Sequence, residues 1–217
     1  MQLAIFDLDN TLIGGDSDYL WGEYLCEQGI INSDGHRHAH RQYYEDYHAG
    51  RLDIQAFLRF QLKPLADNPL DDLERWRRDY IESKIKPILL PRARQLIEDH
   101  RRRGHQLLII TATNRFITEP IAAELGIENL VATEPEFRNG RFTGEVRGLP
   151  SYREGKVQRM HEWLRERGET SCEQWFYSDS HNDIPLLKEV DHPMAVDPDD
   201  QLREFAEKMD WPVISLR

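Results

Sequence analysis

The chain has 217 residues, of which 39% are hydrophobic and 31% charged, and its formal net charge is −11. This length suits one large domain, or a core domain that carries a smaller inserted one. The acidic balance argues against a nucleic-acid partner, because binding to a phosphate backbone requires clustered cations, and no apolar run approaches the roughly 18 residues of a membrane span.

The first expected element is a short buried strand at residues 3–6, and it runs directly into Asp7 and Asp9. A single carboxylate is costly to desolvate, and two are worse. Either these acids lie at the exposed end of the strand, or a cation is held beside them.

Residues 17–86 have a different character. Their apolar side chains recur mostly at helical spacing, in segments separated by Gly29, Gly50 and the loop-like stretch at residues 63–70. This pattern predicts a helical block without a strand. Because the block follows the first strand, we expect an inserted helical cap at 17–86 on an α/β core made of residues 1–16 and 87–217.

Helices and strands alternate after Pro87. Strands are expected at residues 106–110, 129–133, 174–178, 193–196 and 211–216, and helices at 92–103, 115–125, 156–168 and 183–190. Asn139-Gly140 between two short β-prone runs predicts a hairpin with a two-residue turn. The alternation predicts a Rossmann-like, mostly parallel sheet with helices on both faces.

Ligands bind beyond the carboxyl ends of the strands in such a sheet. The residues expected there, together with one lysine at a helix start, are Asp7, Asp9, Thr111, Ala112, Lys156, Asp179, Asn182 and Asp183. Four gathered carboxylates repel one another unless a cation balances them, and oxygen ligands without clustered His or Cys favour Mg²⁺. An ammonium group and a hydroxyl suit a phosphate dianion. The set therefore predicts a site for Mg²⁺-assisted phosphoryl transfer.

These motifs resemble those of a known family. The segment DLDNT at 7–11, Thr111 after an apolar run, Lys156, and SDSHNDIPLL at 178–187 are similar to the four motifs of the haloacid dehalogenase superfamily of phosphohydrolases. The helical insertion directly after the first motif resembles the subfamily that includes phosphoserine-phosphatase-like and histidinol-phosphatase-like enzymes.

The resemblance implies roles for the matched residues. Asp7 would be the nucleophile that forms an aspartyl-phosphate, and Asp9 would be the general acid and then the general base. The groups implied at the phosphate are Thr111, the N–H of Ala112, Lys156 and Asn182. The groups implied at Mg²⁺ are Asp7, the carbonyl of Asp9, Asp179 and, in support, Asp183.

The substrate is less defined by the sequence. Asp16 lies nine residues after Asp7, where phosphoserine phosphatases carry a Glu that faces the substrate's amino group. This favours an amine-bearing substrate, phosphoserine or histidinol phosphate, although Asp16 as a helix cap is an equally good interpretation. The second motif reads TATN at 111–114, where phosphoserine phosphatases have Ser followed by two glycines, which argues against strict phosphoserine specificity. Aromatic residues of the block are expected mainly in its core, with one or two able to stack on an imidazole ring.

The leading interpretation is a cytoplasmic Mg²⁺-dependent phosphomonoesterase that acts on a small phosphorylated metabolite. Transfer of the phosphoryl group to another alcohol, and a non-catalytic phosphate-sensing module, are the alternatives. Cys26 and Cys172 have no metal-type spacing and are expected to be free thiols in a reducing compartment. His36 and His40 share a helical face but lack a third ligand at suitable spacing, so they do not predict a zinc site.

Overall fold

The computed structural model of this chain describes residues 1–169 and 172–217, apart from the side chain of residue 48. Its centre is a six-stranded sheet in which every pairing is parallel. In spatial order the strands are β3 (Asn129–Thr133), β2 (Gln106–Asn114), β1 (Gln2–Phe6), β6 (Glu173–Ser178), β7 (His192–Val196) and β8 (Val213–Ile214). The predicted parallel sheet is therefore confirmed, including the short strand at its edge.

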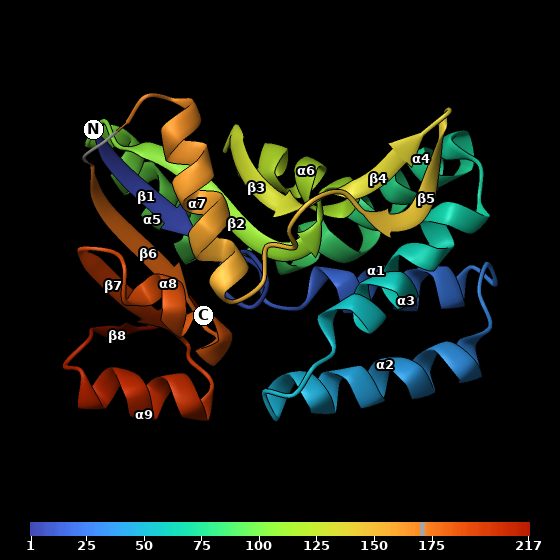
Figure 1. Cartoon of the computed structure of the whole chain (residues 1–217), viewed down its shortest axis with the longest axis horizontal. Coiled ribbons are helices and arrows are strands. Elements are labelled where there is room, and N and C mark those ends of the chain that lie inside the picture. The colour runs from blue at the N-terminus through green and yellow to red at the C-terminus, as the bar shows by residue number, and fades with distance from the viewer. Residues whose placement is uncertain (170–171) are drawn as a thin grey trace.

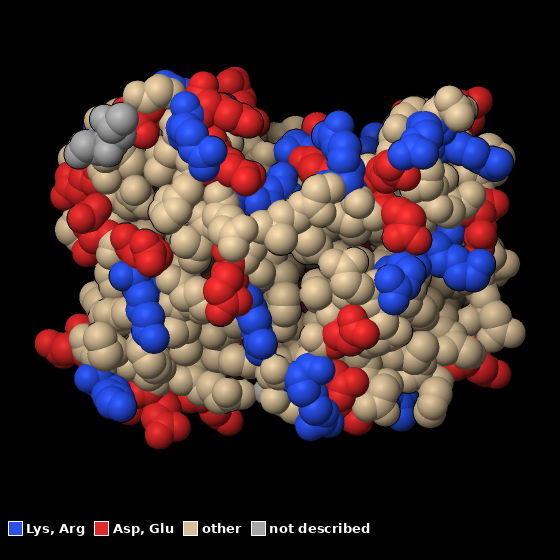
Figure 2. Space-filling model, viewed as in Figure 1, with Lys and Arg blue, Asp and Glu red and all other residues tan. Residues whose placement is uncertain are grey.

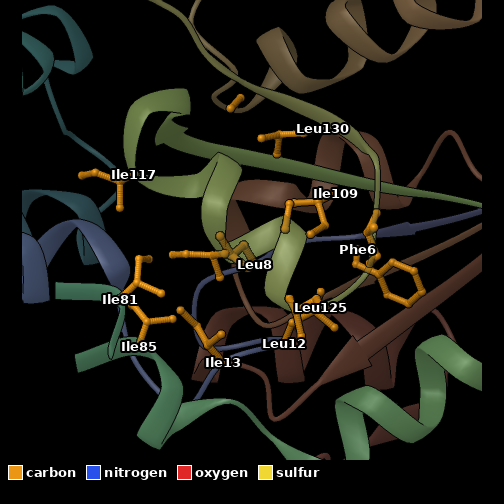
Figure 3. Packing of buried hydrophobic residues seen from close by; sticks show 14 of the residues in the cluster. Phe6, Leu8, Leu12, Ile13, Ile81, Ile85, Ile109, Ile117, Leu125 and Leu130 are labelled. Carbon is orange, nitrogen blue, oxygen red and sulfur yellow. The ribbon is translucent and has the colours of Figure 1, made fainter. Parts of the chain in front are cut away.

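Helices cover both faces of this sheet (Figure 1). One face is covered by α5 (Pro91–Arg102) and α6 (Arg115–Glu124), and the other by α7 (Glu154–Glu166), α8 (Ile184–Leu187) and α9 (Asp200–Lys208). Successive side chains of a strand point to opposite faces. Phe6 accordingly packs in the cluster that contains Ile97 of α5, while Ile5 packs in the one that contains Met160 of α7. Figure 3 shows the first cluster, in which Phe6 and Ile109 come from neighbouring strands.

The segment after β1 is helical, as its spacing predicts. Its elements are α1 (Ser17–Glu27), α2 (Ser33–His48), α3 (Ile54–Asp67), α4 (Leu70–Tyr80), a π-helical turn η1 (Ile81–Ile85) and a 3₁₀ turn η2 (Lys86–Ile88). Ile13 and Leu89 form an antiparallel bridge, and the N–H of Gly14 donates to the carbonyl of Ile88 at 2.8 Å. The chain thus leaves the core and returns to it side by side, and we propose that residues 17–86 are an inserted cap.

The predicted hairpin is confirmed as β4 (Pro135–Arg138) and β5 (Arg141–Val146). Asn139 and Gly140 have φ angles of 52° and 79°, as a type I′ turn requires. The hairpin reaches the cap, because β5 packs against α3. A Cβ added at Gly144 would lie 3.3 Å from the Cβ of Ala66, and Gly144 itself has a φ of +87°, so a larger residue is disfavoured there on two grounds.

No helix within the described residues combines the length and the apolar character that crossing a bilayer requires.

Candidate active site

Three adjacent strands bring the sequence motifs to one rim of the sheet. β1 lies between β2 and β6, with Phe6 in register with Ile109 on one side and Tyr177 on the other. The residues that follow these strands therefore converge, as the strand-end argument predicts. A cavity of about 270 Å³ opens at this rim, and Asp7, Asp9, Ala112 and Asp179 are among the residues that line it.

Lys156 forms the most completely buried polar contact of the site. Its Nζ lies 2.7 Å from Asp7 Oδ1 and 2.7 Å from Asp183 Oδ2, and all three side chains are at least nine-tenths buried. Asp183 also accepts a hydrogen bond of 2.7 Å from Ser178 Oγ. Burial alone would lower the pKa of Lys156, but its two carboxylate partners hold that pKa above its usual value. The lysine, in the first turn of α7, therefore stays charged and holds Asp7 in place.

Negative charge exceeds positive charge around this lysine. Burial raises the pKa of Asp7 to about 7, and the charges of Asp183 and Asp9 add to this effect, against the opposing effect of Lys156. Burial also raises the pKa of Asp179, helped by Asp7 and Asp183. Thr11 fixes Asp179 in position, because its hydroxyl donates to Asp179 Oδ1 at 3.0 Å and accepts from the Asp179 N–H at 3.1 Å. Three carboxylates, those of Asp7, Asp179 and Asp183, gather here around one ammonium group, and such a site is stabilised by a further cation.

The donor set fits a magnesium ion. Mg²⁺ usually takes one or two carboxylates and keeps several waters, so it does not need a cage of protein side chains. Within the described residues no group of three or more His, Cys, Asp or Glu side chains is arranged to hold a metal ion. Asp7 and Asp179, with a main-chain carbonyl from the loop after β1, are the kind of small oxygen set that Mg²⁺ accepts.

Asp9 lies on the opposite side of the loop from this cluster of charges. Its Oδ1 accepts from the N–H of Ser17 at 2.6 Å, and its Oδ2 accepts from Thr113 Oγ1 at 2.9 Å. Burial, with the nearby charge of Asp16, raises the pKa of Asp9 to about 6. A carboxyl group held in one orientation with a pKa near neutrality is suited to donate and accept protons.

In the second motif, at residues 111–114, Ala112 and Thr113 line the cavity and Thr111 does not. Thr111 is buried, and its hydroxyl accepts from the N–H of Thr113 at 3.2 Å. Ala112 and Thr113 line the cavity, and Thr113 is the residue bonded to Asp9. Thr113 was not among the predicted site residues. Residues two apart on an extended chain share a face, so its place two residues after Thr111 could have indicated it.

Asn182 forms hydrogen bonds with the segment that precedes α7. Its Oδ1 accepts from the Tyr152 hydroxyl at 3.1 Å and from Arg153 Nε at 2.8 Å, and it is absent from the residues that line the cavity. Arg153 in turn donates to the carbonyl of Gly50 at 2.9 Å. In this structure the side chain of Asn182 contacts the segment before α7, and its contact with phosphate stays a prediction.

Asp16 is a helix cap, one of the two interpretations that the sequence left open, and its contact with a substrate amine stays a prediction. It is the N-cap of α1, where its Oδ1 accepts from the N–H of Tyr19 at 2.9 Å, and it also lines the cavity. Asp18, two residues further on, lines the same cavity and is 6% exposed. Asp18 was not among the predicted site residues. An acidic side chain in the first turn of a helix is ordinarily exposed to solvent and interacts favourably with the helix dipole.

The histidines that were considered for metal binding pack as side chains between helices. The ring of His36 stacks on Phe60 with centroids 4.7 Å apart, and the ring of His40 meets Tyr19 edge-on at 4.8 Å. His181 Nδ1 lies 2.8 Å from Asp199 Oδ2, beside the site but outside the cavity lining.

Comparison with known proteins places this geometry in a family. The family model of haloacid dehalogenase-like hydrolases matches residues 4–188. A protein of Neisseria meningitidis serogroup C named histidinol-phosphatase is 42% identical over 220 residues, which cover 100% of this chain and 99% of that relative.

Solved structures agree with the fold. A protein of unknown function from Bordetella pertussis is 40% identical and superposes with a TM-score of 0.94, covering 100% of this chain and 99% of that one. A phosphoserine phosphatase captured as an analogue of its phospho-aspartyl intermediate is 17% identical with a TM-score of 0.69, covering 100% of this chain and 93% of that one, and this likeness shows the shared fold. With its four motifs at one rim of a parallel sheet and a helical insertion after the first, this chain belongs to the haloacid dehalogenase-like hydrolases.

Proposed function

We propose that this chain is a Mg²⁺-dependent phosphomonoesterase that works through an aspartyl-phosphate and acts on a small, amine-bearing phosphate ester, with histidinol phosphate as the first candidate. The observation that carries the proposal is the buried contact of Lys156 with Asp7, beside a cavity that Asp9 and Asp179 also line. The full-length relative named histidinol-phosphatase supports the choice of substrate.

The reaction follows from the positions of three side chains. A carboxylate oxygen of Asp7 attacks phosphorus, and the bond from phosphorus to the ester oxygen breaks. Asp9 gives its proton to the leaving oxygen, so that an alcohol departs. Asp9 then takes a proton from water, the water oxygen attacks phosphorus, and the Asp7–phosphorus bond breaks to release inorganic phosphate. Lys156 stays beside Asp7 and neutralises charge on the phosphoryl oxygens.

The metal and the phosphate would be held by neighbouring groups. Asp7, Asp179 and the carbonyl of Asp9 would hold Mg²⁺, with Asp183 in support, and the ion would supply positive charge that stabilises the transferring phosphoryl group. The main-chain N–H of Ala112 and the hydroxyls of Thr111 and Thr113, in the last part of β2, would donate to the phosphate.

The proposed cap would exclude water during these steps. Tyr47 of α2 reaches across the cavity and lies 2.9 Å from Ser180 Oγ, after β6. A segment that closes over the strand ends in this way protects a reactive phosphoryl-enzyme from premature contact with solvent.

The test is phosphate release with Mg²⁺ by the wild type and by Asp7→Asn, using histidinol phosphate, phosphoserine and an aryl phosphate. We expect the substitution to reduce turnover of every ester by roughly 10³-fold or more, because asparagine cannot form the acyl phosphate. Mass spectrometry of the acid-quenched wild type should find a phosphoryl group on Asp7. Asp67→Asn, which changes an exposed aspartate of α3, is the matched control. Undiminished turnover by Asp7→Asn would falsify the assignment.

A further inference from the structure

Three carboxylates gather at the start of α1 without a protein cation. Asp9, Asp16 and Asp18 all line the cavity. Burial raises the pKa of Asp18, and the charges of Asp16 and Asp9 add to this effect. Among the ion pairs of the described residues, none involves any of the three.

Asp18 is the most deeply buried of the three. It is 6% exposed, and the neighbours that meet its carboxylate are neutral amides: Asn114 Nδ2 at 3.5 Å from Oδ1, and Gln61. A buried carboxylate is costly unless it is paired with a cation or well hydrogen-bonded. A role as the N-cap of α1 does not explain why the Asp18 carboxylate is buried, because Asp16 already occupies the N-cap position.

The opposite wall of the cavity is aromatic and comes from the cap. Tyr43, Tyr44 and Tyr47 of α2, with Phe57 of α3, line it. Aromatic faces attract cations and stack on flat rings. The cavity therefore offers acids on one side and π faces on the other.

The charges of the residues that line the cavity also indicate which substrates it disfavours. Arg217 is the one permanently cationic side chain among the described residues that line it. That guanidinium lies 3.7 Å from Asp197 and 3.3 Å from the carbonyl of Asn10, so it already has partners. A substrate that carries a carboxylate would meet Asp9, Asp16 and Asp18 with no arginine reserved for it.

We propose that Asp18 is a specificity-determining residue, which together with Asp16 selects phosphate esters of dibasic amino alcohols that have no carboxylate. An ammonium group would lie at Asp16, and a ring N–H of a heteroaromatic base at Asp18, with the ring against the cap tyrosines. This inference rests on the proposed phosphatase function and sharpens it, because histidinol phosphate fits this description and phosphoserine does not.

The chain offers a matched control for Asp18. α1 begins Asp16-Ser17-Asp18 and α2 begins Asn32-Ser33-Asp34, so Asp18 and Asp34 occupy the same position after an N-cap. Asp34 is exposed. Asp34→Asn therefore removes the same carboxylate from a helix start, away from the buried group of acids.

The experiment measures kcat/KM for histidinol phosphate, phosphoserine and phenyl phosphate. We expect the wild type to prefer histidinol phosphate to phosphoserine. In Asp18→Asn the ratio of kcat/KM for histidinol phosphate to that for phenyl phosphate should fall on the order of 100-fold, the size of effect expected when a charged hydrogen bond to a substrate is lost. Asp34→Asn should keep the wild-type ratio. An unchanged ratio in Asp18→Asn, or a wild type that prefers phosphoserine, would overturn the proposal.

Binding of L-histidinol, the alcohol without its phosphate, separates this inference from the proposed reaction. Calorimetry should detect binding to the wild type and to Asp34→Asn, and much weaker binding to Asp18→Asn and Asp18→Ser. If no ester is hydrolysed but histidinol binds in this pattern, the catalytic proposal fails and the role of Asp18 stands. Equal binding by all four proteins would remove that role. Thermal unfolding of each variant confirms that it is folded.

Discussion

The buried acids of this site differ in whether a protein cation faces them. Lys156 lies 2.7 Å from both Asp7 and Asp183, whereas Asp18 has neutral neighbours. A buried ion pair offsets its desolvation cost only when its geometry and hydrogen bonds are good, and here the lysine has two carboxylates in direct contact. The paired acids are thereby fixed in place, and the unpaired ones are left to interact with a ligand.

His100 should make stability depend on pH. It is 2% exposed, with its ring nitrogens 2.8 Å from His105 Nδ1 and 2.8 Å from the Tyr177 hydroxyl. Burial, with the charge of His105 and Arg103, lowers the pKa of His100 to about 4, against 6.5 for an ordinary histidine. The folded state therefore favours the neutral ring. This contribution to stability is complete above pH 6.5 and is lost as the pH falls toward 4.

The variant that tests this is His100→Gln. Between pH about 7.5 and about 5 the wild type should lose roughly 2 kcal/mol of unfolding free energy that the variant, though less stable overall, does not lose. Urea unfolding across this range measures the difference. His161→Gln, at an exposed position on α7, should follow the wild-type curve. Parallel curves for wild type and His100→Gln would mean that His100 does not control this pH dependence.

At the residue scale, the sequence predicted where the site lies. It did not predict the direction in which every side chain of the site points. Asp7, Asp9 and Asp179 were predicted because a strand end fixes where the backbone lies, and Lys156 was predicted from its place at the start of a helix. The structure brings the four residues together. Where a side chain points depends on packing by distant segments. Asn182 turns toward Arg153 because a loop some 30 residues earlier supplies donors, and no local pattern records that contact.

At the scale of the elements, the loop between α2 and α3 joins the cap to the core beside the site, in addition to the contact of Tyr47 with Ser180. Arg153 donates to the Gly50 carbonyl in this loop and to Asn182 in the core. Arg153 has a φ of 50°, a conformation that costs a non-glycine residue about 1–3 kcal/mol. Such strain persists only where surrounding contacts hold it, and these hydrogen bonds hold Arg153 in this conformation.

Replacing Arg153 by alanine should loosen this loop. We expect amide hydrogen exchange across residues 49–53 to become on the order of tenfold faster, because the variant lacks the hydrogen bond to the Gly50 carbonyl that opposes local opening. KM for the preferred ester should rise while the exchange of β1 and β6 stays the same. Arg94→Ala, at an exposed position on α5, is the control and should change neither quantity. Unchanged exchange at 49–53 in Arg153→Ala would show that this link does not hold the cap.

The elements themselves were largely predictable, because their signals are local. The hairpin follows from Asn139-Gly140, and helix α5 ends beside Gly104 as expected. Some features were not predicted, among them helix α9 (Asp200–Lys208). β2 continues to Asn114, beyond its apolar run, and α4 passes into a π-helical turn at Ile81–Ile85. Both depend on contacts between segments that are distant in the sequence: the β2 extension carries Thr113 to Asp9, and Ile85 is fully buried in the hydrophobic cluster shown in Figure 3.

On the scale of the whole molecule, the charges of the surface and those of the site are distributed differently. Acidic and basic side chains are interspersed on the face shown in Figure 2, although the net charge is −11. A mixed surface of this kind offers no broad basic patch on that face, and the absence of a nucleic-acid partner stays a prediction. The site, in contrast, concentrates acids from segments more than 170 residues apart in the sequence, from Asp7 to Asp179.

Mg²⁺ should therefore stabilise the entire fold. A ligand that binds only the native state adds RT ln(1 + [L]/Kd) to the unfolding free energy, about 2.7 kcal/mol at 100 times Kd. For a protein of this size that corresponds to a rise in Tm of roughly 5–10 °C. Asp179→Asn should abolish most of the rise in Tm, because it removes a carboxylate that is proposed to bind the cation and whose charge the cation would neutralise. NaCl at equal ionic strength controls for screening, which acts on surface charges in both proteins alike. If Mg²⁺ raised the Tm of Asp179→Asn as much as that of the wild type, the ion would be acting elsewhere, and the acids at this rim would need another counter-charge.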